Sequence, residues 1–135
     1  MTGGWLGLRA AVCVLMATAA APVLAQSGGF PLGGELFLDA QPMPGSKRIP
    51  NMDVGTNSSV ILEMWCNRVD GQLVIAGDTM TVVLGQPTER SCRPDQAQRD
   101  SDLLAALNAV TSWRREGDDV VFVGARPLRF KIASH

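Results

Sequence analysis

Two cysteines in the middle of the chain, Cys66 and Cys92, are the residues best suited to chemistry. A cysteine nucleophile needs a base beside it, and the only histidine, His135, is the last residue of the sequence. A zinc site needs several ligands at characteristic intervals, and these two cysteines do not have that spacing. We therefore expect no catalytic residue, no bound metal and no cofactor.

Two pairs of carboxylates offer a second kind of chemistry. Acid–base catalysis of the glycosidase type needs two carboxylates that face one cleft. Asp118 and Asp119 fall in a predicted turn. Asp100 and Asp102 lie in the first part of a predicted helix, on its solvated side. Because acidic residues are favoured in both places for structural reasons, we predict that the protein is not an enzyme.

The first 25 residues have the features of a signal peptide. Their only charge is Arg9, an Ala-rich apolar stretch follows at residues 10–21, and Val23-Leu24-Ala25 resembles a signal-peptidase site. The apolar stretch is too short for a comfortable transmembrane helix, and an uncleaved N-terminal anchor is the alternative. We expect cleavage after Ala25, which gives a periplasmic protein that starts at Gln26 and has no stable membrane insertion.

Export would place Cys66 and Cys92 in an oxidising compartment. Removal of the signal peptide also discards the third cysteine, Cys13, and leaves an even number. In exported proteins such a pair more often forms a disulfide than a metal site. Two free thiols that pack as small hydrophobic side chains are the alternative.

The charge of the mature chain argues against two classes of partner. The formal net charge of −1 drops by one unit when Arg9 is removed with the signal peptide. No basic surface therefore favours nucleic acid, and the interspersed acidic and basic residues form no polybasic patch for lipid. The expected partner is an unknown envelope protein or a small ligand, and the sequence leaves the oligomeric state open.

Short strands separated by turns dominate the pattern after a flexible leader at residues 26–32. Strands are expected before the helix at residues 35–38, 49–54, 59–65, 72–75 and 79–84, and after it at 113–115, 120–123 and 128–132. The dipeptide Asp70-Gly71 is a signal for a hairpin turn. The apolar residues of 59–65 predict a strand that is largely buried on both faces.

One segment, residues 95–111, has the pattern of an amphipathic helix. Pro94 stands at its entrance, and Asp95 with Gln98 resembles a capping box. One apolar face of the helix is formed by Leu103, Leu104, Ala106, Leu107 and Val110. Residues 33–133 are thus predicted to form one mainly β domain of the α+β type. It should contain an antiparallel, barrel-like sheet of seven or eight strands and one packed α-helix.

The order of the motifs resembles that of a known family. The segment Cys66-Asn67-Arg68-Val69-Asp70-Gly71 comes first, Gly77-Asp78 follows, and Thr88 and Cys92 precede the helix. This order is similar to that of the META domain, also called the HslJ-like heat-shock family, over residues 33–133. The motif positions are Cys66, Asn67, Gly71, Thr88 and Cys92.

The resemblance implies a small β-barrel-like sheet with one helix, found in bacterial envelope proteins that are linked to stress tolerance and antibiotic resistance. It implies no catalytic residue. We therefore expect a non-catalytic periplasmic protein that serves envelope maintenance, stress tolerance or antibiotic resistance. The alternative is a small secreted β-barrel that binds a ligand or inhibits an enzyme.

Four residues are candidates for contact with such a ligand or partner. For Asn67, a structural role in a turn is favoured over ligand contact. Trp65 and Trp113 should fill the core, although one of them lining a barrel mouth is the alternative. Together with Arg114 they form the candidate ligand or partner surface. The C-terminal strands carry four arginines that suit a solvated face or an anionic partner: Arg114, Arg115, Arg126 and Arg129.

Overall fold

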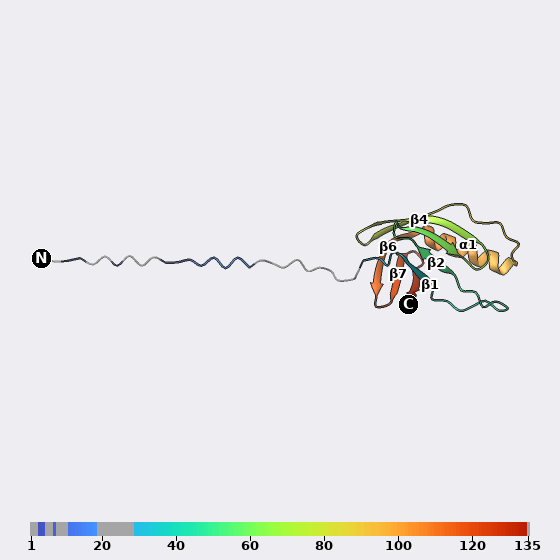
Figure 1. Ribbon diagram of the computed structural model, residues 1–135, viewed down its shortest axis with the longest axis horizontal. Helices are drawn as coiled ribbons and strands as arrows, with labels where there is room; N and C mark the ends of the chain where they lie inside the picture. The colour runs from blue at the N-terminus through green and yellow to red at the C-terminus, as the bar shows by residue number, and fades with distance from the viewer. Residues whose placement is uncertain (1–2, 5–6, 8–10, 19–28, 135) are drawn as a thin grey trace.

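The computed structural model describes residues 3–4, 7, 11–18 and 29–134. The predicted cleavage site before Gln26 and the terminal His135 lie outside these residues. Residues 11–18 form no helix or strand and run outside the barrel (Figure 1), and their apolar side chains, such as Leu15, are exposed. No helix among the described residues combines the length and the apolar character that a membrane crossing requires.

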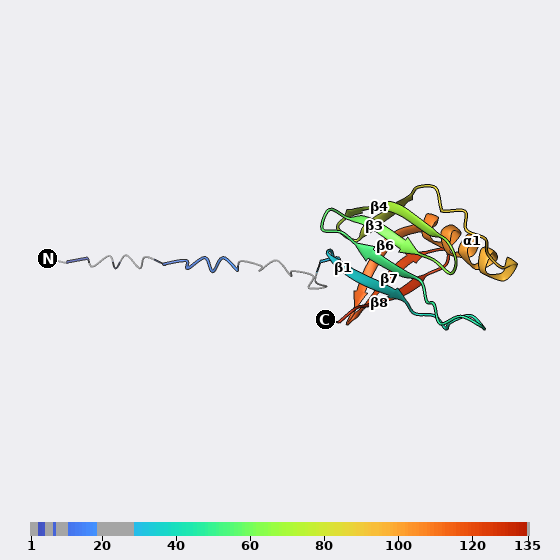
Figure 2. The ribbon, with the colours of Figure 1, turned by 45° about the vertical axis from the view of Figure 1, so that its right-hand side comes forward.

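Eight antiparallel strands form a closed barrel in which each strand pairs with its neighbours in the sequence. The strands are β1 (Gly34–Leu38), β2 (Asn51–Val54), β3 (Ser59–Glu63), β4 (Arg68–Ala76), β5 (Thr79–Leu84), β6 (Val110–Glu116), β7 (Asp119–Gly124) and β8 (Leu128–Ile132). Strand β8 pairs with β1 and so closes the barrel, with Leu36 opposite Ile132 (Figures 1 and 2). The predicted antiparallel, barrel-like sheet with one helix is confirmed.

Apolar side chains from alternate strand positions fill the barrel. Leu36, Met52 and Leu62 are register partners on β1, β2 and β3, and all three are fully buried. On the adjoining strands that close the barrel against β1, Phe122 of β7 and Phe130 of β8 are equally buried, with ring centroids 4.7 Å apart. Successive side chains of a strand point to opposite faces, so the inward positions build one continuous core.

The helix α1 (Pro94–Asn108) lies at one end of the barrel, beside the β3–β4 turn (Figure 2). Leu103 and Leu107 are buried in the core cluster, as their spacing predicts. The helix begins earlier than expected because its N-cap is Arg93, whose N–H donates to Oε1 of Gln96 at 3.2 Å. It also ends earlier, because Val110 already belongs to β6.

The expected hairpin turn at Asp70-Gly71 is wrong. Both residues lie inside β4, and the chain turns instead at residues 64–67, where the N–H of Met64 donates to the carbonyl oxygen of Asn67. Gly71 is required by close packing: a Cβ at this position would lie 2.4 Å from the carbonyl oxygen of Val83 on β5. The glycine therefore marks a close approach between two strands. In the sequence, a glycine required for such an approach looks the same as a glycine in a turn.

Strand β3 is shorter than residues 59–65 and is buried on one face only. Ile61 is 38% exposed, because it lies on the outer face of the barrel. Met64 and Trp65 are buried, but they lie in the turn after the strand and contact the helix end of the barrel. The apolar run at residues 59–65 therefore consists of a strand that is buried on one face and a buried turn, and not of one strand buried on both faces.

Phe30 extends the core beyond the predicted domain boundary. It belongs to the segment expected to be a flexible leader, of which the structure describes residues 29–32. Its ring centroid lies 5.3 Å from that of Trp113, edge-on, and 6.0 Å from that of Phe122. Aromatic pairs prefer such tilted arrangements, so this short segment packs against the barrel before β1 begins.

Candidate functional site

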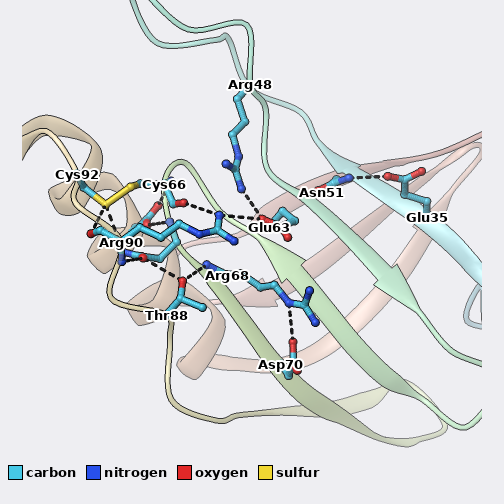
Figure 3. Close-up of polar contacts among 12 residues, drawn as sticks. Glu35, Arg48, Asn51, Glu63, Cys66, Arg68, Asp70, Thr88, Arg90 and Cys92 are labelled. Carbon is cyan, nitrogen blue, oxygen red and sulfur yellow. Dashed lines mark hydrogen bonds and ion pairs between the residues drawn. A yellow bond between two sulfur atoms is a disulfide. The ribbon is translucent and has the colours of Figure 1, made fainter.

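Cys66 and Cys92 form a disulfide, with their Cα atoms 6.1 Å apart (Figure 3). Cys66 lies in the β3–β4 turn, and Cys92 lies two residues before α1. The predicted disulfide is confirmed, and the alternative of two free thiols is wrong. The bond joins the turn that leads into β4 to the loop that leads into the helix.

Asn67 holds the loop between β5 and α1 against the β3–β4 turn. Its Oδ1 accepts a hydrogen bond from the backbone N–H of Arg90 at 2.7 Å and another from Oγ1 of Thr88 at 3.0 Å. Its Nδ2 lies 3.3 Å from Sγ of Cys92 and donates to it. The side chain bonds to a segment more than twenty residues away rather than to its own turn, so its role is structural.

Thr88 extends this attachment to the start of β4. Its Oγ1 accepts a hydrogen bond from the N–H of Arg68 at 2.9 Å, and its own N–H donates to the carbonyl oxygen of Arg68 at 2.8 Å (Figure 3). The loop therefore pairs with β4 through one residue. The motif residues that the sequence singles out are thus brought together, with the exception of Gly71, which acts between β4 and β5.

Asp100 is the member of this cluster that sequence reasoning missed. The sequence predicts that it lies on the solvated start of the helix, but it is only 4% exposed. Its carboxylate accepts hydrogen bonds from the backbone N–H groups of Cys66 at 3.1 Å and Asn67 at 2.7 Å. A signal was present, because Asp100 precedes Leu103 by three positions and Leu107 by seven, which places it on the buried face.

These five residues, Cys66, Asn67, Thr88, Cys92 and Asp100, are called the motif cluster below. Arg90 adds a further link, since its guanidinium donates to the carbonyl oxygen of Cys66 at 3.1 Å and pairs with Glu63 at 3.5 Å (Figure 3). The polar atoms of the cluster are bonded to one another or to the backbone. The arrangement can brace a fold, but it presents no free nucleophile or base.

The candidate surface of Trp65, Trp113 and Arg114 is not formed. Trp65 lies just before β4, whereas the indole N–H of Trp113 donates at 2.8 Å to the carbonyl oxygen of Gly77, just after β4. The two tryptophans are therefore at opposite ends of this strand. Arg114 is exposed on β6 and pairs with Glu116 at 2.7 Å.

Glu116 accepts hydrogen bonds from two arginines of the C-terminal strands. The bond from Arg114, followed by that from Arg129, holds the pKa of the Glu116 carboxyl below its ordinary value. Conversely, the hydrogen bonds to Glu116 and Asp119 raise the pKa of the Arg129 guanidinium. Arg114 and Arg129 are thus paired with carboxylates of the same chain, and these two of the four C-terminal arginines do not form an anion-binding face.

Trp65 instead lines a surface cavity of about 350 Å³ beside the motif cluster. The cavity lies where α1 meets the end of β1, the β3–β4 turn and the start of β8. It is lined by Leu38, Trp65, Arg99, Asp102, Leu103, Ala106, Arg126, Pro127 and Leu128. Of the residues that the sequence offers as ligand or partner contacts, Trp65 and one of the four C-terminal arginines, Arg126, lie here. Within the described part of the chain, no group of three or more His, Cys, Asp or Glu residues is placed to hold a metal ion.

A closed eight-stranded antiparallel barrel with one helix, braced by a Cys-Asn motif, defines the class of this protein. The sequence profile of the META domain matches residues 35–133, which is most of the chain. The protein therefore belongs to the META-domain family, as its motifs indicated.

Two solved structures share this fold. An NMR structure of a protein from Burkholderia xenovorans has a TM-score of 0.64 and 15% sequence identity, and the match covers 77% of this chain and 84% of that one. A second NMR structure has a TM-score of 0.58 and 15% identity, and the match covers 74% of this chain and 89% of that one. A search of proteins with curated descriptions finds no match. At this identity the likeness concerns the fold alone.

Proposed function

We propose that this protein is a non-catalytic, exported META-domain protein that serves the bacterial envelope in stress tolerance or antibiotic resistance. The observation that carries the proposal is the Cys66–Cys92 disulfide, because such bonds form and persist in oxidising compartments such as the periplasm. The packed interior of the barrel supports a role that does not use an internal ligand. The exposed apolar residues 11–18, which lie outside the core cluster, suit a segment that is removed.

Export is tested by expressing the full chain in a Gram-negative host and fractionating the cells. We expect a periplasmic protein whose mass corresponds to a chain that starts at Gln26 and carries one disulfide. A variant with Ala25→Arg, which blocks the predicted cleavage site, should stay at its full length and serves as the matched control. An intact wild-type chain in the cytoplasm, with reactive thiols at both motif cysteines, would contradict the proposal.

The envelope role is tested by deleting the gene in its own bacterium and challenging the cells with heat and antibiotics. Complementation should restore survival when the wild-type protein is supplied. A Cys66→Ser, Cys92→Ser protein should restore it less well above the temperature at which the unbridged domain unfolds. Equal survival of the deletion strain and its parent under every stress would refute this role.

A second candidate function is ligand binding by the barrel's outer surface. The observation that favours it is the cavity at Trp65, whose volume lies within the range of about 300–1,000 Å³ that is common for small-molecule sites. Its lining combines apolar side chains with charged groups, as ligand sites usually do.

A further inference from the structure

The arginines of the barrel divide into two groups according to their partners. Nine arginines lie in the described part of the chain. Most of them donate a side-chain hydrogen bond to an acceptor of the same chain: Arg48, Arg68, Arg90, Arg93, Arg114, Arg115 and Arg129. Among the described residues, only Arg99 and Arg126 form no side-chain hydrogen bond and no ion pair, and both line the cavity at Trp65.

The two unpaired arginines come from different elements. Arg99 lies on α1, and its guanidinium carbon is 5.1 Å from the centroid of the Trp65 ring, in a cation–π contact. Arg126 lies in the turn between β7 and β8 and lines the same cavity. The contact with Trp65 fixes Arg99 over the indole without neutralising its charge. Two guanidinium groups with free donors therefore share one cavity.

The rest of the lining is largely apolar. Trp65, Leu103 and Ala106 are buried, and Leu38 and Leu128 are half-buried at the ends of β1 and β8. A guanidinium is a planar donor that matches the geometry of a carboxylate, and apolar side chains favour an apolar ligand body. The cavity thus offers both parts of an amphipathic anion a complementary surface.

One carboxylate, Asp102, also lines the cavity. It accepts a hydrogen bond from Nε2 of Gln98 at 2.9 Å, and no ion pair joins it to Arg99 or Arg126. The ionisable lining therefore carries two positive charges and one negative charge, which leaves one positive charge in excess. An anion is favoured over a cation, and Asp102 should weaken its binding.

We propose that this cavity binds a small organic carboxylate with an apolar or aromatic body. The carboxylate bonds to Arg99 and Arg126, and the body packs on Trp65, Leu38 and Leu128. This inference rests on the second candidate function, since it names the ligand class and the residues of that same site. It is independent of export and of the role in stress tolerance.

The test is an NMR titration of the mature chain with three probes. The first, 4-phenylbutyrate, has both a carboxylate and an apolar body. The second, 4-phenylbutanol, lacks the charge, and the third, acetate, lacks the body. The mature chain has two tryptophans, and Trp113, at the other end of β4, provides an internal reference.

We expect 4-phenylbutyrate to shift the indole N–H signal of Trp65 and leave that of Trp113 unchanged. Its Kd should be on the order of 1 mM or lower for a ligand of this size, and both other probes should bind at least about tenfold more weakly. Arg99→Gln and Arg126→Gln should each raise the Kd about tenfold, because each removes a charge-assisted hydrogen bond. Arg115→Gln, the same change outside the cavity, should leave it unchanged.

Two further variants separate recognition from a general loss of structure. Asp102→Asn should lower the Kd about twofold to threefold, because it removes the opposing charge. Arg126→Lys keeps the charge and should restore part of the affinity that Arg126→Gln loses. Thermal unfolding of the Arg99, Asp102 and Arg126 variants should stay close to that of the wild type, since these three side chains are exposed.

The outcomes distinguish this proposal from the function on which it rests. Equal affinities for 4-phenylbutyrate and 4-phenylbutanol, or unchanged affinity in both arginine variants, would overturn carboxylate recognition but leave a ligand site at Trp65. Acetate binding as tightly as 4-phenylbutyrate would overturn the role of the apolar lining. If none of the probes shifted the Trp65 signal, both the carboxylate site and the ligand-binding function would be refuted.

Discussion

The motif cluster and the cavity lie side by side at the helix end of the barrel, yet they use their polar side chains in opposite ways. Trp65 and Cys66 are neighbours in the sequence, as are Arg99 and Asp100, and one member of each pair belongs to each region. Asp100 is buried and bonds to two backbone N–H groups. Arg99 and Arg126 are exposed, and within the described chain neither has an acceptor.

The difference follows from the cost of burying polar groups. A buried carboxylate must be hydrogen-bonded within the fold, so Asp100 has one arrangement that the native state fixes. An exposed guanidinium is satisfied by water and can exchange that water for a ligand. Burial therefore separates the residues that hold this end of the barrel together from those that remain available for binding.

The largest expected effect is the loss of both regions when the helix is loosened from the barrel. Leu107 is fully buried in the core, so Leu107→Ala should destabilise the domain by about 2 to 5 kcal/mol. Chemical unfolding of the mature chain measures this loss. Ser101→Ala, at an exposed position of the same helix, is the control. Equal unfolding midpoints for the two variants would show that the helix is not anchored through Leu107.

Removal of the disulfide should affect the motif cluster strongly and the cavity only through stability. Cys66 and Cys92 are 26 positions apart, and opening a loop of this size should cost about 3 kcal/mol in the chain-entropy model. Cys66→Ser, Cys92→Ser should therefore lower the unfolding midpoint. The Kd of the folded variant for 4-phenylbutyrate should match that of the wild type. An unchanged midpoint would mean that the bond contributes nothing to stability.

Substitutions of Asp100 and of Asp102 compare a buried residue of the motif cluster with an exposed residue of the same helix. Asp100→Asn is nearly isosteric, but it loses the charge and one acceptor, which leaves a buried N–H of Cys66 or Asn67 unpaired. We expect the free energy of unfolding, measured by denaturant titration, to fall by about 1 to 3 kcal/mol. Asp102→Asn, two positions along on the exposed part of α1, is the matched control and should change stability by less than about 0.5 kcal/mol. If both variants lowered the free energy of unfolding by the same amount, Asp100 would contribute no more to stability than an exposed helix residue does.

The cavity arginines should contribute little to stability. Arg126→Gln should change the free energy of unfolding by less than about 0.5 kcal/mol, since its side chain forms no hydrogen bond within the fold. Arg99→Gln should cost at most about 1 kcal/mol, the size of the exposed cation–π contact with Trp65. Denaturant titration of the ligand-free proteins measures this. If either variant lowered the free energy of unfolding by more than about 2 kcal/mol, that arginine would stabilise the fold and would not be free for a ligand.

The smallest effect concerns Glu116, outside both regions. Hydrogen bonds from Arg114 and Arg129 hold the pKa of this carboxyl below its ordinary value in the folded state. Its contribution to stability is therefore fully present above the pKa of the unfolded chain and is lost as the pH falls through the folded pKa. Glu116→Gln should slightly flatten the acid side of the stability profile, measured by thermal unfolding. A steeper profile would contradict this sign.

The order of the elements and most of the core residues could be read from the sequence alone. Alternating apolar residues and turn signals are local patterns, so β5 and β8 could be located to the residue, and the helix was found within a few positions. The motif from Cys66 to Cys92 was also visible, and with it the family. These features depend on residues close together in the chain or on a fixed order of short segments.

The roles of several residues depend instead on how distant segments of the chain pack together. Gly71 has the signature of a turn, but it lies in a strand because β5 passes too close for a Cβ. Asp100 has the composition of an exposed helix start, but the β3–β4 turn buries it. Arg99 and Arg126 meet at one cavity because α1 packs beside the β7–β8 turn. Each of these roles depends on contacts between segments far apart in the chain, and local patterns do not contain them.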